Sequence, residues 1–244
     1  MITPETLVFD DKSEMIATAA RRFVDLVTHA QSERGVASVV LTGGSNGIAI
    51  LRALAADSGG IDWGRVELFW GDDRFVPADD PERNYGQACD ALLDHVPVDP
   101  ARVHQMAPSD GVFGDDIEAA AEDYADVLMK VGTGAVPHFD LHLLGMGGEG
   151  HINSLFPHTA ATAESEKTVV AVEDSPKPPP RRITLTLPVV NRAKSVWFLV
   201  TGEDKAEAVA AAHMGAHAAD WPCAGAHGTD ETVWFVDRPA AARI

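Results

Sequence analysis

Apolar residues along this chain recur at two spacings, and each spacing predicts a different kind of element. Between Ser13 and Gln31 they recur every three or four positions, which predicts an amphipathic helix with Ser13 as its N-cap. The same spacing predicts further helices over 48–56, 84–95, 115–131 and 203–217. Short apolar runs rich in β-branched residues predict strands over 38–41, 66–70, 139–144, 168–172, 182–187, 195–200 and 233–236.

Strands that alternate with helices in this way are typical of α/β proteins. We therefore predict an α/β fold with a mainly parallel, Rossmann-like sheet and helices on both faces. The chain shows no internal repeat, and the Pro-rich stretch 175–180 is too short to link two domains. We interpret this stretch as a stiff loop and expect one domain over residues 1–244.

The composition narrows the class of partner. Of the 244 residues, 45% are hydrophobic and 23% are charged, as in an ordinary globular protein. A formal net charge of −18 argues against binding to nucleic acid or to an anionic membrane surface, because both are themselves negative. A small anionic ligand is still compatible with this charge, because a local cluster of Lys and Arg residues outweighs the global field at short range.

The sequence carries no signal for a membrane or an oxidising compartment. Its first residues lack the basic and apolar regions of a signal peptide, and no apolar run approaches the roughly 18 residues that span a bilayer. The two cysteines, Cys89 and Cys223, form no zinc pattern, and two reduced thiols are a simpler account than a disulfide. We expect a soluble, cytoplasmic protein. The sequence does not define its oligomeric state and is compatible with a monomer.

Four loops directly follow predicted strands, over 42–47, 71–74, 145–151 and 201–205. In a parallel sheet all four emerge on the same edge, where open α/β sheets place their ligands. The first and fourth lead through glycine into a helix, so backbone N–H groups at Gly43 and Gly44 and the helix dipole favour a phosphate. Ser45 adds a hydroxyl and Lys205 a charge, although neither loop is a Walker A motif. We therefore predict a cleft for an anionic ligand.

The loop that begins at Gly145 is dense in glycine and presents a single histidine, His151. Glycines such as Gly147 let the backbone approach a substrate, and a histidine held there takes a proton from water near neutral pH. The same residues also match the dinucleotide fingerprint G-x-G-x-x-G. That interpretation requires a helix directly after Gly150, which Pro157 opposes.

Segments 41–47, 66–77, 139–157, 176–184 and 199–205 resemble the glucosamine-6-phosphate isomerase/6-phosphogluconolactonase family, and within it the lactonases. The most specific matches are Gly-His-Ile-Asn-Ser-Leu-Phe-Pro over 150–157 and Pro-Lys-Pro-Pro-Pro-Arg-Arg-Ile-Thr over 176–184. The related deaminases are expected to have a Phe-Asn-Glu-Pro type sequence where this chain has Ser154 to Pro157. The missing glutamate favours the lactonase.

The resemblance implies hydrolysis of 6-phospho-D-glucono-1,5-lactone to 6-phosphogluconate, in the oxidative pentose phosphate pathway. His151 would act as general base on the attacking water, with Glu149 beside it either orienting the imidazole or contacting the substrate. Neither a metal nor an organic cofactor is implied, because an activated lactone needs mainly positioning and a base. The residues implied to hold the phosphate end are Ser45, Arg74, Lys177, Arg182 and Lys205.

The chain departs from the family pattern at three places. Glu149 stands where Asp is usual, Asn46-Gly47 where Thr-Pro is usual, and Asn153 where a small residue is usual. None of these changes removes an expected catalytic group.

Several other residues have two interpretations. For Asp72, which we count among the substrate-binding residues, and Asp73, we favour the interpretation that they fix Arg74 or cap the loop over the one in which they form an acid–base pair. His213 and His217 have the i, i+4 spacing of metal ligands, but no catalytic glutamate lies between them, so we favour a solvated helix face. Besides the lactonase, a glucosamine-6-phosphate deaminase and a non-catalytic sugar-phosphate sensor are the alternatives. A sensor that acts as a regulator would need a DNA-binding module, and this chain has no segment of that kind.

Overall fold

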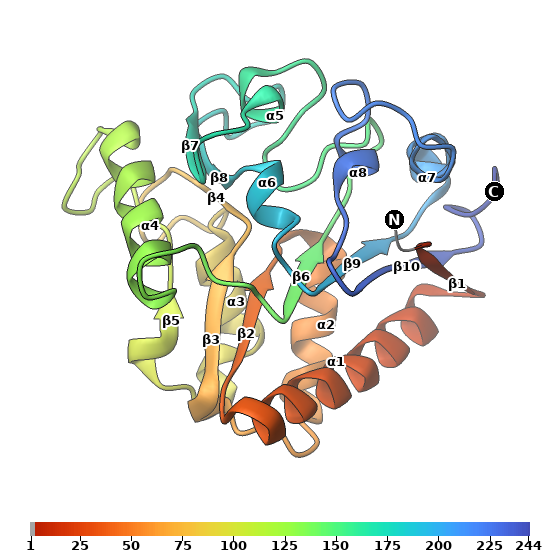
Figure 1. Cartoon of the computed structure of the whole chain (residues 1–244), viewed down its shortest axis with the longest axis horizontal. Coiled ribbons are helices and arrows are strands. Elements are labelled where there is room, and N and C mark those ends of the chain that lie inside the picture. The colour runs from red at the N-terminus through yellow and green to blue at the C-terminus, as the bar shows by residue number, and fades with distance from the viewer. Residues whose placement is uncertain (1–2) are drawn as a thin grey trace.

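A seven-stranded parallel sheet runs through the centre of the computed structural model, which describes residues 3–244 (Figure 1). The order of its strands is β1-β10-β9-β6-β2-β3-β5, and every neighbouring pair is parallel. The strands are β1 (Glu5–Phe9), β2 (Ala37–Leu41), β3 (Val66–Trp70), β5 (Val103–His104), β6 (Leu141–Leu144), β9 (Ser195–Val200) and β10 (Glu231–Asp237). The predicted parallel α/β sheet is therefore confirmed.

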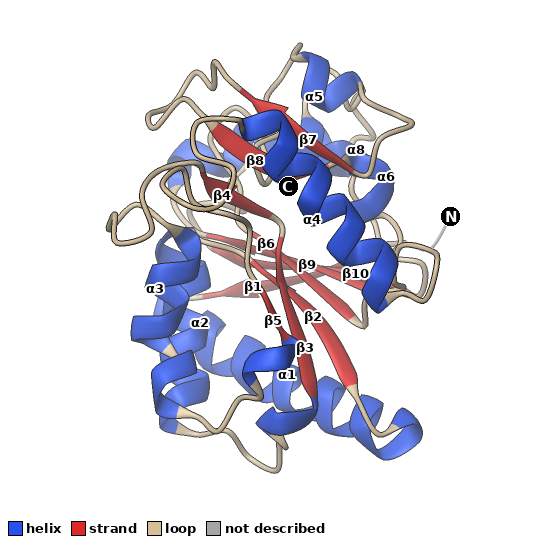
Figure 2. Ribbon diagram, turned by 90° about the vertical axis from the view of Figure 1, so that its left-hand side faces the viewer, coloured by secondary structure: helices blue, strands red, loops and turns tan. Residues whose placement is uncertain are grey.

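Helices cover both faces of this sheet, as predicted (Figure 2). One face carries α1 (Lys12–Arg34), α2 (Gly44–Ala56) and α3 (Asn84–Ala91). The other carries α4 (Ile117–Val131), α6 (Leu187–Val190), α7 (Ala206–His213) and α8 (Pro222–Gly225), with α5 (Ala160–Ala163) beside β7. Short 3-10 helices lie at η1 (Trp63–Arg65), η2 (Leu93–His95), η3 (Pro100–Arg102) and η4 (Glu203–Lys205). None of the helices between residues 3 and 244 is long and apolar enough to cross a bilayer.

Two apolar cores explain why the strands have continuous apolar sequences. Val39 and Leu41 of β2 point into the core under α1 and α2, whereas Val40 between them points into the core under α4. Leu68 and Phe69 of β3 divide in the same way. A strand buried on both faces needs apolar residues at every position, as in other parallel sheets.

A second, smaller sheet lies beyond the edge where the loops emerge. Its order is β4-β8-β7, and both pairs are antiparallel; the strands are β4 (Asp72–Arg74), β8 (Arg182–Leu185) and β7 (Val169–Val172). The sequence predicts the last two as strands but gives no sign of a separate sheet. Only residues 173–181 connect them, which is too short for the crossover that a parallel pair requires.

Element ends differ from the predictions where local turn chemistry decides them. The N-cap of α1 is Asp11, not Ser13, because the Asp11 carboxylate accepts a hydrogen bond from Glu14 N at 3.0 Å. The helix predicted to reach residue 217 ends at His213, two residues before Gly215, which has a φ of +72°. The edge strand β1 was not predicted.

Tyr124 of α4 joins this helix to the end of β3. Its ring is fully buried, and its hydroxyl accepts a hydrogen bond from Trp70 N at 3.0 Å and lies 3.2 Å from the carbonyl oxygen of His104. Trp70 is the last residue of β3, and Gly71 begins one of the four loops. The hydroxyl therefore fixes the point where this loop leaves the sheet.

Replacing Tyr124 with Phe should lower the free energy of unfolding by about 1–3 kcal/mol, because the buried Trp70 N–H loses its partner. Urea denaturation measures the change. Tyr85→Phe is the matched control, since Tyr85 is only partly buried and its hydroxyl holds no strand end. Equal losses in the two variants would contradict the assigned role of the Tyr124 hydroxyl.

Candidate active site

The four loops predicted to meet do so at the carboxyl ends of β9, β6, β2 and β3, which are neighbours in the sheet. Two hollows open there and share the wall formed by Gly43, Gly44, Gly145 and Met146. The first, of about 150 Å³, is also lined by Thr42, Asp72, Arg74, Asn84, His151, Asn153 and Arg182. The second, of about 200 Å³, is also lined by Ser45, Asn46, Leu199, Val200, Thr201 and Lys205. Sequence-predicted residues therefore line both hollows.

The loop after β6 holds His151 in a defined position. Gly147 N donates a hydrogen bond to the His151 carbonyl oxygen at 3.0 Å, and Gly150 has a φ of +78°, in the region that favours glycine. The imidazole stacks on Phe156, with ring centroids 4.4 Å apart, and its side chain is only 17% exposed. A side chain at Gly147 would overlap His151 Nδ1. The glycines thus make room for the imidazole.

Burial decides the protonation state of His151. Burial, together with a smaller effect of the nearby Lys177, lowers the pKa of His151 from 6.5 to about 4 against the raising effects of Glu149 and Asp72. The imidazole is therefore neutral near pH 7 and able to accept a proton. This is the protonation state that a general base requires.

Glu149 lies between His151 and Lys177. Its Oε1 is 3.2 Å from His151 Nδ1, but the angle leaves this nitrogen without a well-formed hydrogen bond in the free protein. Lys177 Nζ lies 2.8 Å from Oε1 and 2.9 Å from Oε2. Burial raises the pKa of Glu149, but the bond from Lys177, a backbone N–H and the nearby imidazole together lower it to about 2. The carboxylate is therefore charged at neutral pH.

Asp72 and Asp73 point to opposite sides of β4 and do not form a pair. Asp72 accepts hydrogen bonds from Ser154 Oγ at 2.7 Å and from Asn84 Nδ2 at 3.2 Å, and lines the hollow. Asp73 accepts from the backbone N–H groups of Asn84 and Tyr85, at the start of α3. The favoured interpretation, that these residues hold the loop, agrees with this geometry.

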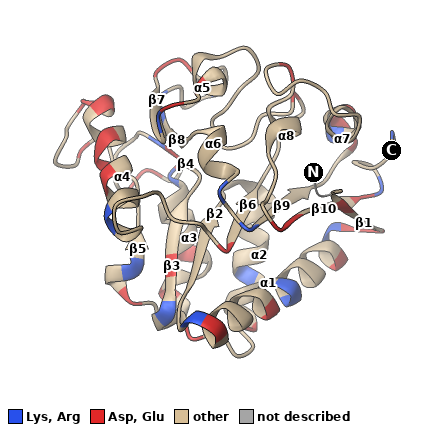
Figure 3. Ribbon diagram, in the orientation of Figure 1, with Lys and Arg blue, Asp and Glu red and all other residues tan. Residues whose placement is uncertain are grey.

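The two arginines at this edge already have partners. Arg74 Nη1 donates to the Glu82 carbonyl oxygen at 2.6 Å and to Asn84 Oδ1 at 2.9 Å. Arg182 donates to the carbonyl oxygens of Lys177 and Pro179, both at 2.9 Å, and its Nη1 lies 3.9 Å from Asp72. Each guanidinium thus supports a loop while lining the hollow. Figure 3 shows these basic positions where β4 and β8 pair, whereas acidic positions follow α4.

Sequence reasoning missed two residues that line the hollow, Asn84 and Asn153. Asn84 begins α3 and packs so closely against Gly43 that a side chain at Gly43 would overlap its amide. Asn153 has a φ of +47°, and its Nδ2 lies 3.5 Å from Nε2 of the buried His142. Asn adopts this left-handed conformation more readily than most residues do. The sequence alone does not reveal that Asn153 adopts it.

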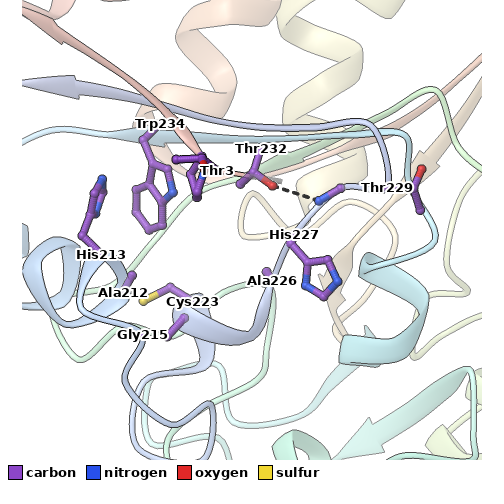
Figure 4. A pocket seen from close by; sticks show the side chains of 13 residues that line it. Thr3, Ala212, His213, Gly215, Cys223, Ala226, His227, Thr229, Thr232 and Trp234 are labelled. Atoms are coloured by element: carbon purple, nitrogen blue, oxygen red, sulfur yellow. Dashed lines mark hydrogen bonds between the residues drawn. The ribbon is translucent and has the colours of Figure 1, made fainter. Parts of the chain in front are cut away.

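A more spacious hollow than these two, of about 760 Å³, lies elsewhere, between α7, α8 and β10 (Figure 4). Among residues 3–244 its lining contains no Lys or Arg, and Trp234 and Cys223 form part of its mainly apolar wall. A phosphate would find no lysine or arginine there, so the smaller pair of hollows at His151 is the better candidate for the predicted anionic ligand.

Known proteins resemble this chain over nearly its whole length. The family model described as glucosamine-6-phosphate isomerases/6-phosphogluconolactonase matches residues 10–234. The chain is 54% identical over 239 residues to the 6-phosphogluconolactonase of Mycobacterium tuberculosis, with 97% of each chain covered. It is 51% identical to that of Streptomyces coelicolor, covering 99% of this chain and 95% of the relative. The structure of 6-phosphogluconolactonase from Trypanosoma brucei superposes with a TM-score of 0.86 at 26% identity, covering all of both chains.

The overlap at Gly147 gives a test of the loop geometry. Gly147→Ala should displace the imidazole of His151 and leave the fold intact, because the added Cβ meets His151 and Glu149 rather than the core. The ring ¹⁵N signals of His151 report the displacement, and thermal unfolding reports the fold. Gly60→Ala is the control, because its nearest neighbour, Thr28 Cγ2, would lie 3.8 Å from the new Cβ, an ordinary contact. Unchanged His151 signals in Gly147→Ala would show that the loop does not define the ring position.

Proposed function

We propose that this chain, which belongs to the glucosamine-6-phosphate isomerase/6-phosphogluconolactonase family, hydrolyses 6-phospho-D-glucono-1,5-lactone to 6-phosphogluconate with His151 as the general base. The observation that carries the proposal is a buried, neutral imidazole that lines a hollow together with Arg74 and Arg182. Its Nδ1 faces Glu149, so Nε2 is the nitrogen available to a water molecule.

In the proposed mechanism the water oxygen attacks C1 of the lactone while Nε2 of His151 takes one of its protons. The Glu149 carboxylate stabilises the imidazolium that forms. The Nδ1···Oε1 contact of 3.2 Å shortens to a charged hydrogen bond as the positive charge develops. Backbone N–H groups of the glycine loops stabilise the tetrahedral oxyanion. The C1–O5 bond then breaks, and the imidazolium returns its proton to O5, which becomes the hydroxyl of the open product.

The phosphate end of the substrate binds in the second hollow. There the amino-terminal end of α2, a helix of 13 residues, presents Gly44 and Ser45 beside Lys205. Arg74 and Arg182 border the first hollow and add positive charge between the two ends of the substrate. The shared glycine wall lets one small ligand extend from His151 to Lys205.

Two further points support this assignment over its alternatives. The segment Ser154 to Pro157 carries no carboxylate, and a deaminase would need one near the histidine. Lactone opening needs only water, a base and hydrogen-bond donors, so the proposed mechanism uses no metal or organic cofactor.

We also infer that the two sheets act as one domain, because α4 packs on β7 and binds β3 through Tyr124.

Purified protein should accelerate hydrolysis of 6-phosphogluconolactone generated in situ, after spontaneous opening is subtracted. His151→Ala should lose about 10²- to 10⁴-fold in kcat, the usual contribution of a general base, without loss of fold. Activity should persist in EDTA. The control is His29→Ala, an exposed histidine on α1. Wild-type kcat in His151→Ala would refute the mechanism, and no acceleration at all would make glucosamine 6-phosphate the next substrate to test.

The pH profile of kcat/KM tests the state of the base. A general base works only when it is unprotonated, so activity should be lost as the pH falls through the pKa of His151, which burial lowers to about 4. The activity should therefore hold between neutral pH and about pH 5 and fall below it. Circular dichroism at each pH separates this loss from unfolding. An acid limb near 6.5 in folded protein would contradict the buried base.

A further inference from the structure

Lys177 lies with Glu149 and not with the phosphate-binding groups. Its Nζ is within 2.9 Å of both carboxylate oxygens of Glu149. Among the described residues that line the two hollows, Arg74, Arg182 and Lys205 are the cations, and Lys177 is not one of them. The resemblance grouped it with the phosphate ligands, but the geometry gives it a different partner.

The backbone around Lys177 is held in place, so the ion pair is not an accident of a free surface side chain. Arg182 donates to the Lys177 carbonyl oxygen, and Ser175 Oγ donates to the same oxygen at 3.1 Å. Farther along, Arg181 binds Glu173 at 2.8 Å and also pairs with Asp115. The Pro-rich loop is thereby fastened at both ends and directs Lys177 toward the loop of His151.

Glu149 needs such a partner because its side chain is long. A glutamate has one more rotatable bond than an aspartate, and an unrestrained carboxylate at this partly exposed site would sample several rotamers. Lys177 bonds to both oxygens and so selects the rotamer in which Oε1 lies 3.2 Å from His151 Nδ1. The carboxylate beside the imidazole is therefore held by a residue that makes no hydrogen bond to the imidazole itself.

We propose that Lys177 is a positioning residue that acts through Glu149 to hold His151 in its working orientation, and that it does not bind the substrate phosphate. The proposal rests on the assignment of His151 as the base. It assigns Glu149, which is not among the residues that line the two hollows, the task of orienting the imidazole.

Lys177 also affects the proton affinity of His151. The charged groups that face the imidazole are Glu149 on its own loop, Asp72 on β4, Lys177 before β8, and Arg182, whose guanidinium lies over the Phe156 ring. Among these, Lys177 disfavours the imidazolium, whereas Glu149 and Asp72 favour it. Removing the lysine charge should thus raise the pKa of His151 and move the acid limb of the pH profile upward.

The test compares two substrates, 6-phosphogluconolactone and glucono-1,5-lactone, which has no phosphate. Lys177→Gln should lower kcat about tenfold or more on both substrates, with KM for the phosphorylated lactone changed by less than about twofold. A positioning defect is independent of the phosphate, so the fold-loss should be the same for both. The His151 ring signals in NMR should titrate at a higher pH in this variant than in the wild type.

Two variants serve as controls. Lys177→Arg should restore most of kcat, because a guanidinium also binds both oxygens of a carboxylate. Lys167→Gln changes an exposed lysine before β7 and should behave as wild type. The proposal is overturned if Lys177→Gln raises KM for the phosphorylated lactone at unchanged kcat and leaves glucono-1,5-lactone unaffected, as a phosphate ligand would. It is also overturned if kcat and the His151 titration are both unchanged. Failure of the base assignment itself is seen separately, in His151→Ala.

Discussion

The burial of one imidazole is the constraint on which the rest of this site depends. A histidine in water is partly protonated near neutral pH, but His151 lies against Phe156 under a loop of glycines and stays neutral. The same burial makes the imidazolium costly, so a base in this place is weak unless a negative charge supports it while it holds the proton. Glu149 supplies that charge at 3.2 Å. The glycine loop and the stacked ring thus keep the imidazole neutral, and the carboxylate stabilises it once it has taken the proton.

The position of the site was accessible from the sequence because it follows from strand ends. Apolar runs at 38–41, 66–70, 139–144 and 195–200 are strands of one parallel sheet, and parallel strands present their following loops on one edge. Gly43, His151 and Lys205 could therefore be placed together without coordinates. The antiparallel sheet of β4, β8 and β7 could not be predicted in this way, because β4 pairs with β8 more than 100 residues farther along the chain and no turn marks that pairing.

The roles of the charged residues were harder to predict than their location. A sequence shows that Lys177, Arg181 and Arg182 are cations near the site, but not which acceptor each one meets. In the structure Arg182 is occupied mainly by carbonyl oxygens, Arg181 by Glu173, and Lys177 by Glu149. Lys177 and Glu149 are 28 residues apart in the sequence. A hydrogen bond between two such loops depends on how the loops are packed against each other, which the sequence does not show. Asn84 was missed for the same reason.

The pairing of these cations bears on how an acidic protein takes an anionic substrate. With a net charge of −18, the long-range field opposes the approach of a sugar phosphate, so the attraction must act within a few ångströms. Lys205 lies 2.7 Å from Asp204 at the mouth of the second hollow, and a phosphate must compete with that exposed carboxylate. The backbone N–H groups at the start of α2 are not paired with a carboxylate in this way. Binding a phosphate to them also costs no side-chain conformational entropy. In the proposed phosphate site the helix terminus is therefore the part that needs no rearrangement, and the lysine adds a charge that must leave Asp204 to reach the phosphate.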